Sequence, residues 1–285
     1  MMEGNYYKEW STALGRDMEF KVYGSGGVPV LAFPCQGGRF YDWENNGMPD
    51  AAAWLIQNGR IQLFCADSID HDSFLAEGLS PRRRAEMQEK YFCYITGELV
   101  PRILALNAAA KPAEEASKAA DKPAKTEKAG PILWAVGADL GAYQAVNCRL
   151  RRPELFCGAI GLSGRYDVSG WLGGPEDDLA LRNDPFAALS VGLLDSAAKA
   201  ALAKGQFLLC AGQAQDYAEP AALASTQALD AALKAAGIPA AAEIWGQDVT
   251  HEWRWWPAPS MCSPTVCSAE EATCHARIHH RSPGP

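Results

Sequence analysis

Short apolar runs alternate along the chain with longer segments in which apolar residues recur at helical spacing. The runs are nearly continuous, which is typical of strands buried on both faces of a sheet, and they lie at 28–33, 61–66, 132–136, 156–162, 207–211 and 241–245. The segments with helical spacing include 81–106, 140–150 and 220–236. This alternation predicts an α/β fold with a mostly parallel central sheet and helices on both faces.

Two of the expected helices have recognisable starts. A helix is predicted over 50–56, with Asp50 as its N-cap and Gly59 just past its end. Pro81 suits the first turn of the next helix, because a first-turn residue needs no intrahelical bond from its N–H.

Two segments fall outside this alternation. Residues 1–257 are predicted to be a single domain that contains the first of these segments as an insertion, and the second is the tail that follows this domain. Residues 108–130 contain nine Ala, five Lys and two Pro but no aromatic or branched aliphatic residue, so they predict a flexible insertion without a core. The tail 258–285 contains Cys, His and Pro residues. Its spacing C-x4-C-x6-C-H-x3-H does not match a zinc pattern, and we expect a disordered tail and no metal site.

Composition narrows the class of protein. The 285 residues are 48% hydrophobic and 21% charged, which is ordinary for a globular chain, and the net charge of −8 argues against nucleic acid or an anionic membrane as a partner. No run of apolar residues is long enough to span a membrane. The first residues lack the apolar core of a secretory signal, and several cysteines lie within apolar runs, so a cytoplasmic location is expected.

The most informative motif is Gly137-x-Asp139-x-Gly141, which follows a predicted strand and leads into a predicted helix. This is the layout of a nucleophile elbow, where two glycines permit a tight corner and the central residue projects above the sheet. The expected pattern is G-x-S-x-G. Here the central residue is aspartate.

Candidate partners for this elbow follow in the order that an α/β hydrolase requires, an acid and then a histidine. Asp216 and Glu219 come after the strand 207–211, and His251 comes after the last strand. An oxyanion hole would combine the N–H of Leu140 with one from the glycine-containing loop 35–38, where Cys35 and Gln36 are the candidates.

These residues resemble the esterase D-like branch of the α/β-hydrolase superfamily. The resemblance covers roughly 5–106 and 131–257, and it is carried by FPCQGGRFYD at 33–42, GADLGAYQA at 137–145, LSGRYD at 162–167 and WGQDVTHEWRWW at 245–256. It implies a hydrolase of short-chain carboxylic esters, with a small-molecule substrate and no cofactor. By position it implies Asp139 in the nucleophile's place, His251 as the base, and Asp216 or Glu219 as the acid.

Three hypotheses address the aspartate. In one, the chain is an ester hydrolase whose serine has been substituted and whose chemistry is impaired. In another, it is a catalytically inactive pseudo-hydrolase with a binding or regulatory role, in which Asp139 pairs with His251 and keeps it protonated. In the third, Asp139 is itself the nucleophile toward alkyl halides or epoxides, as in the dehalogenase and epoxide-hydrolase branches of the fold. Those branches resemble H-D-W-G, with a Trp directly after the Asp, whereas Leu140 follows Asp139 here.

Two further possibilities carry less weight. Ser163 is rejected as a substitute nucleophile, because its glycines are spaced G-x-S-G and no helix follows at once. An adaptor protein that binds partners through 108–130 is a more distant alternative.

The insertion hypothesis predicts where a protease acts first. Limited trypsin digestion should cut earliest at the lysines of the segment, which are Lys111, Lys118, Lys122, Lys125 and Lys128. Mass mapping of the first fragments checks this, and early cleavage elsewhere with these lysines protected would contradict it.

Overall fold

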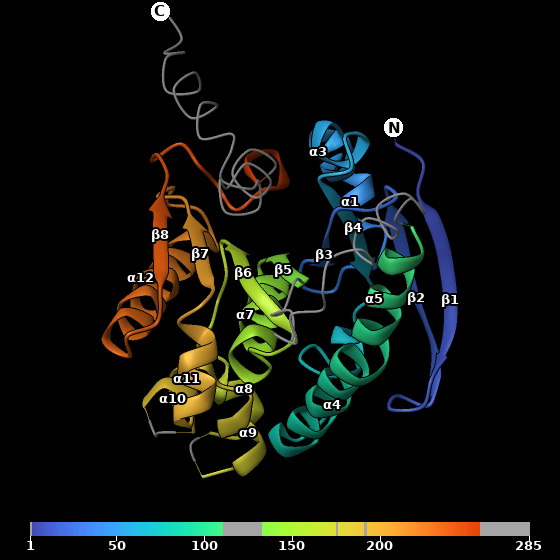
Figure 1. Ribbon diagram of the computed structural model, residues 1–285. Helices are drawn as coiled ribbons and strands as arrows, with labels where there is room; N and C mark the ends of the chain where they lie inside the picture. Colours follow the sequence, from blue (N-terminus) through green and yellow to red (C-terminus); the bar gives the residue numbers. More distant parts are fainter. Residues whose placement is uncertain (1, 111–132, 175, 191–192, 257–285) are drawn as a thin grey trace, which may run out of the picture.

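A single sheet organises the chain. The computed structural model describes residues 2–110, 133–174, 176–190 and 193–256. The sheet has eight strands in the order β1-β2-β4-β3-β5-β6-β7-β8 (Figure 1). β1 pairs with β2, and β2 with β4, in antiparallel orientation, and all other neighbours are parallel. The strands are β1 (Asn5–Ser11), β2 (Arg16–Tyr23), β3 (Val28–Phe33), β4 (Ile61–Ala66), β5 (Leu133–Ala138), β6 (Phe156–Leu162), β7 (Gln206–Ala211) and β8 (Ala240–Ile244).

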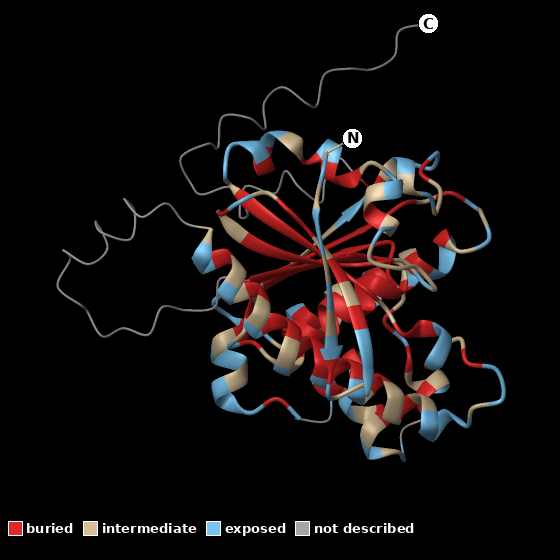
Figure 2. Cartoon of the chain, turned by 90° about the vertical axis from the view of Figure 1, so that its right-hand side faces the viewer, coloured by how far each residue is buried: buried red, intermediate tan, exposed pale blue. Residues whose placement is uncertain are grey.

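Helices cover both faces of this sheet, as predicted. Val30 and Ala32 of β3 belong to the same apolar core as α1, α2 and α3, whereas Leu31 and Phe33 belong to the core formed with α4 and α5. Successive side chains of a strand point to opposite faces, so the two cores lie on opposite sides of the sheet. Figure 2 shows the buried strands between the two layers.

The segments 81–106, 140–150 and 220–236 are helical close to the bounds expected from the sequence, whereas 42–57 forms three short helices. These helices are α1 (Asp42–Asn45), α2 (Met48–Ala51), α3 (Ala53–Gln57), α4 (Pro81–Tyr94), α5 (Val100–Ala109), α7 (Leu140–Arg151) and α12 (Glu219–Ala235), with a π-helical turn at Ile95–Leu99 joining α4 to α5.

Two features differ from the sequence-based expectation. The hairpin of β1 and β2 was not predicted, because β1 lies at the sheet edge with much of its surface exposed and has no continuous apolar run. Asp50 is not an N-cap, since it lies inside α2, which starts after Gly47 and has Pro49 in its first turn. The predicted single helix over 50–56 is divided into α2 and α3.

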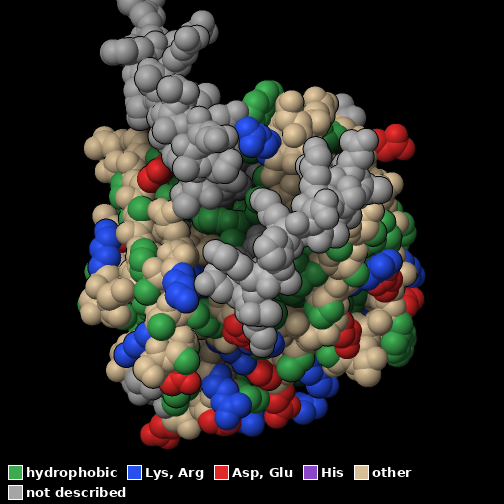
Figure 3. Space-filling view, in the orientation of Figure 1, with side chains coloured by type: hydrophobic (Ala, Val, Ile, Leu, Met, Phe, Trp, Pro, Cys, Tyr) green, Lys and Arg blue, Asp and Glu red, His purple; other side chains and the backbone are tan. Residues whose placement is uncertain are grey.

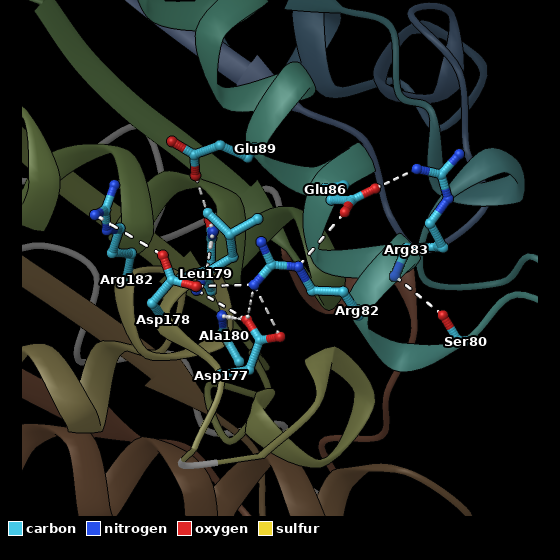
Figure 4. A network of polar contacts seen from close by, with 11 residues as sticks. Ser80, Arg82, Arg83, Glu86, Glu89, Asp177, Asp178, Leu179, Ala180 and Arg182 are labelled. Atoms are coloured by element: carbon cyan, nitrogen blue, oxygen red, sulfur yellow. Dashed lines mark hydrogen bonds and ion pairs between the residues drawn. The ribbon is translucent and has the colours of Figure 1, made fainter.

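Four short helices lie between β6 and β7, and charged side chains tie one of them, α9 (Asp178–Arg182), to α4. The other three are α8 (Ser169–Leu172), α10 (Pro185–Ser190) and α11 (Ser196–Leu202). Arg82 of α4 contacts Asp177 and Asp178 at 3.0 and 2.8 Å (Figure 4). Charged side chains of both signs gather at the bottom of the face in Figure 3, where Figure 1 places α4, α8 and α9.

Some predictions concern residues that the structure does not describe. The predicted insertion 108–130 lies outside the described residues from 111 onward, and so does the whole tail 258–285. Within the described ranges, no helix combines the length and apolarity needed to cross a membrane. The same part of the chain has no group of three or more His, Cys, Asp or Glu side chains that could hold a metal ion.

Candidate active site

Asp139 occupies the sharp turn between β5 and α7. Its backbone has φ 56° and ψ −119°, which residues with a Cβ atom rarely adopt. A Cβ atom on Gly137 would lie 2.1 Å from the Gly141 oxygen, and one on Gly141 would lie 2.2 Å from the Pro34 oxygen. Only glycine fits at these two positions, so the frame around Asp139 folds as a tight strand–turn–helix corner.

The carboxylate of Asp139 reaches two groups that the sequence suggested for the site. Its Oδ2 accepts a hydrogen bond from the Gln36 N–H at 3.2 Å, and its Oδ1 lies 3.7 Å from Nε2 of His251. The side chain is 24% exposed, so solvent reaches it. One carboxylate therefore contacts both the candidate oxyanion donor and the candidate base.

Two acids contact His251 in different ways. Nδ1 of His251 lies 2.8 Å from Oε2 of Glu219. Asp216 instead accepts the backbone N–H of His251 through Oδ2 at 2.7 Å, and its Oδ1 accepts the N–H of Glu219 at the start of α12. The structure thus separates two acids that the sequence could not distinguish: Glu219 contacts the imidazole, and Asp216 holds the backbone around it.

Glu219 is fully buried and is held by a polar network of its own. Its Oε1 accepts hydrogen bonds from the Ser163 hydroxyl at 2.8 Å and from the Gly212 N–H. Ser163 in turn accepts a hydrogen bond from Nε1 of Trp256 at 3.1 Å. Each of these contacts fixes the carboxylate that orients His251.

Ser163 is a site residue that sequence reasoning missed, because it was considered only as a nucleophile. Its side chain is buried and donates to Glu219, and its backbone has φ 48°. A serine at a constrained turn directly after a central parallel strand is the signal that could have identified it, since polar site residues gather at that edge of such sheets.

The pKa of His251 is raised to about 9. Burial of the ring acts to lower this pKa, but hydrogen bonding and charge attraction from Asp139 and Glu219 outweigh it. The imidazole is therefore protonated at neutral pH. A protonated imidazole has no free lone pair, so it cannot accept a proton as a general base.

The backbone N–H groups of the three candidate oxyanion residues, Cys35, Gln36 and Leu140, have different partners. The Gln36 N–H is directed at Asp139, whereas the Cys35 N–H donates to Oδ2 of Asp42 at 3.1 Å. Leu140 is the first residue of α7, where backbone N–H groups have no partner within the helix. Gln36 and Leu140 thus lie at the elbow, and the Cys35 N–H is engaged elsewhere.

Solved structures with similar folds include an esterase and a hydrolase. A ferulic acid esterase aligns with a TM-score of 0.65 and 14% identity, over 93% of this chain and 97% of that one. MPT51 of Mycobacterium tuberculosis aligns with a TM-score of 0.64 and 15% identity, over 90% of this chain and 94% of that one. An S-formylglutathione hydrolase from Agrobacterium tumefaciens aligns with a TM-score of 0.58 and 15% identity, over 90% of this chain and 95% of that one.

These similarities establish the fold. No family model matches the sequence, and no curated protein matches it. The chain has the α/β-hydrolase fold, as predicted from the alternation of strands and helices and from the elbow.

The tight turn at the elbow leads us to expect that any side chain at position 141 destabilises the folded protein. Gly141→Ala should lower the free energy of unfolding by about 1–3 kcal/mol, because its methyl group overlaps the Pro34 oxygen. Urea denaturation measures this. Gly170→Ala is the matched control, since a Cβ there meets nothing within 4 Å. Equal stabilities for the two variants would contradict the steric argument.

The ion pair predicts an unusual histidine titration. In an NMR titration, His251 should change protonation near pH 9. Asp139→Asn should lower the pKa of His251, because Asp139 is one of the two carboxylates, with Glu219, that raise it. His251→Asn identifies the signal. A His251 ring that is neutral at mildly acidic pH would exclude the pairing with Asp139.

The same shift predicts a pH dependence of stability. The folded-state pKa of about 9 exceeds the ordinary histidine pKa of 6.5, so protonated His251 favours the folded state. This contribution, on the order of 3 kcal/mol, is fully present below pH ~6.5 and is lost as the pH rises through about 9. Urea denaturation at several pH values should show that loss, and His251→Asn should flatten it.

Proposed function

We propose that this chain is an esterase-type α/β hydrolase built for short-chain carboxylic esters, with chemistry impaired by Asp139 in the nucleophile's place. The observation that carries the proposal is the position of the Asp139 carboxylate, between the Gln36 N–H at 3.2 Å and Nε2 of His251 at 3.7 Å. A serine hydroxyl at this elbow would face the same base. The named activities of the similar structures, an esterase and a hydrolase, agree with this class of reaction.

Asp139 impairs ester hydrolysis in three ways. Its charge keeps His251 protonated, which removes the general base. Its Oδ2 occupies the Gln36 N–H that would bind the carbonyl oxygen of the substrate. Attack by a carboxylate on an ester would also produce a high-energy anhydride rather than an ordinary acyl-enzyme.

A second candidate function is hydrolysis of alkyl halides or epoxides with Asp139 as the nucleophile. It is favoured by the hydrogen bond from the Gln36 N–H to Oδ2, which fixes the carboxylate with Oδ1 on the side of His251. Attack of the carboxylate on carbon would form an ester on Asp139 as the carbon–halogen bond breaks and halide leaves, or as the epoxide C–O bond breaks and its oxygen takes a proton. The negative charge of Asp139 would then be gone. The pKa of His251 would then fall, and the neutral ring could activate the water that cleaves the ester.

The third candidate is a binding or regulatory pseudo-hydrolase. It is supported by the same ion pair between Asp139 and His251, which leaves the fold and the site intact while the base stays charged. The first and third candidates predict different results for Asp139→Ser: an impaired esterase would gain ester hydrolysis, and a pseudo-hydrolase would not.

The test is Asp139→Ser. The unsubstituted protein should show no more than background turnover of p-nitrophenyl acetate or butyrate, and the variant should exceed it by about a hundredfold or more. The reason is that the hydroxyl faces a histidine that has lost its charged neighbour and is still held by Glu219. Initial rates at saturating ester measure the gain.

The control is the double variant Asp139→Ser with His251→Ala, which should lose the gain. Full ester turnover by the unsubstituted protein would overturn the argument. No gain in the serine variant would favour the pseudo-hydrolase. Turnover of a haloalkane or epoxide by the unsubstituted protein, abolished by Asp139→Asn, would establish the aspartyl nucleophile instead.

A further inference from the structure

Three successive backbone N–H groups of the loop after β3 each donate to a different carboxylate. The Cys35 N–H donates to Asp42 Oδ2 at 3.1 Å. The Gln36 N–H donates to Asp139 Oδ2 at 3.2 Å, and the Gly37 N–H donates to Asp70 Oδ2 at 2.9 Å. The middle donor is the one directed at the elbow, and the donors on either side of it are engaged by acids that do not belong to the elbow.

The two outer acids come from two different elements of the chain. Asp42 is the first residue of α1, and Asp70 begins a 3-10 turn, Asp70–Asp72, shortly after β4. The loop is also closed on itself, because the Gly38 N–H donates to the Cys35 oxygen at 2.9 Å. The peptide that carries the Gln36 N–H is therefore fixed at both ends.

We propose that Asp42 and Asp70 are positioning residues that aim the Gln36 N–H at the place of the ester's carbonyl oxygen. This inference rests on the proposed ester-hydrolase function and assigns a role to two acids outside the predicted triad. An oxyanion donor stabilises the transition state only if it is oriented before charge develops. Each outer carboxylate occupies a neighbouring N–H group, so the Gln36 N–H is the loop donor that stays directed at the elbow and is available to substrate once Asp139 is absent.

The burial of Asp70 supports a positioning role. Its side chain is only 4% exposed, and burial above all raises its pKa to about 7, with the charge of Asp139 adding to the rise and the Gly37 N–H opposing it. Burying a carboxylate lowers the free energy of unfolding, and buried acids with shifted pKa values concentrate at functional sites. Asp42 is half-buried, and burial also raises its pKa while the Cys35 N–H opposes the rise.

The first experiment measures kinetics in the Asp139→Ser background. Adding Asp42→Ala or Asp70→Ala should lower kcat for p-nitrophenyl butyrate by about 10- to 100-fold, less than the loss of a whole donor, while KM changes by less than about threefold. Asp42→Asn and Asp70→Asn should recover most of the loss, because an amide oxygen still accepts the N–H. A merely structural role would not produce this split between kcat and KM.

Asp72→Ala is the matched control. Asp72 lies on the same 3-10 turn as Asp70 but pairs with Arg16 at 2.5 Å on the surface. This variant should leave kcat unchanged. If both alanine variants at Asp42 and Asp70 retained kcat, or if Asp72→Ala lowered kcat as much as they do, the proposal would be wrong. Asp42→Ala tests the idea independently should Asp70→Ala fail to fold, since Asp42 is less buried.

The second experiment does not depend on turnover. With Asp139 in place, Asp70→Ala and Asp42→Ala should each speed amide hydrogen exchange at Gln36 by about tenfold or more, whereas Asp72→Ala should not. Unchanged exchange at Gln36 in both alanine variants would overturn the positioning role. If Asp139→Ser showed no turnover but the alanine variants still sped amide exchange at Gln36, the proposed ester-hydrolase function would be wrong. The positioning of the Gln36 N–H by Asp42 and Asp70 would remain supported.

Discussion

The close approach of β3, β5 and α7 is the constraint on which the site depends. The oxygen of Pro34, at the end of β3, leaves no room for a side chain at Gly141, and the oxygen of Gly141 leaves none at Gly137. The residue between these glycines is forced into a positive-φ turn and projects toward the loop after β3 and toward His251. Because the backbone fixes the place, the chemistry of the site depends on which side chain stands at position 139.

With aspartate there, electrostatics dominates the site. The carboxylates of Asp139 and Glu219 lie on opposite sides of one imidazole and hold it in its charged form. The machinery that orients His251 does not itself involve Asp139: Glu219 is held by Ser163 and Gly212, and Asp216 holds the His251 backbone. An intact orienting network beside a disabled base is what the substituted-esterase proposal requires.

Much of the fold followed from the sequence, and part of the site did not. The central parallel strands were predictable because burial on both faces demands continuous apolar runs, whereas the exposed edge strand β1 has no such signature. His251 and the elbow could be predicted as candidates from their order after particular strands. The choice between Asp216 and Glu219 could not be made, because both follow β7 and lie close together in the sequence, and only the turn into α12 decides which carboxylate reaches the ring. The support from Ser163, Asp42 and Asp70 depends on contacts between distant segments, which no local pattern encodes.

The most direct test of the central claim is covalent labelling with a fluorophosphonate ester, followed by intact mass and peptide mapping. The reagent reports a hydroxyl nucleophile that has a working base and an oxyanion donor beside it. The account predicts no adduct on the unsubstituted protein and one adduct, mapped to position 139, on Asp139→Ser. Labelling of the unsubstituted protein at another serine, such as Ser163, would show that the nucleophile lies elsewhere and would contradict the account.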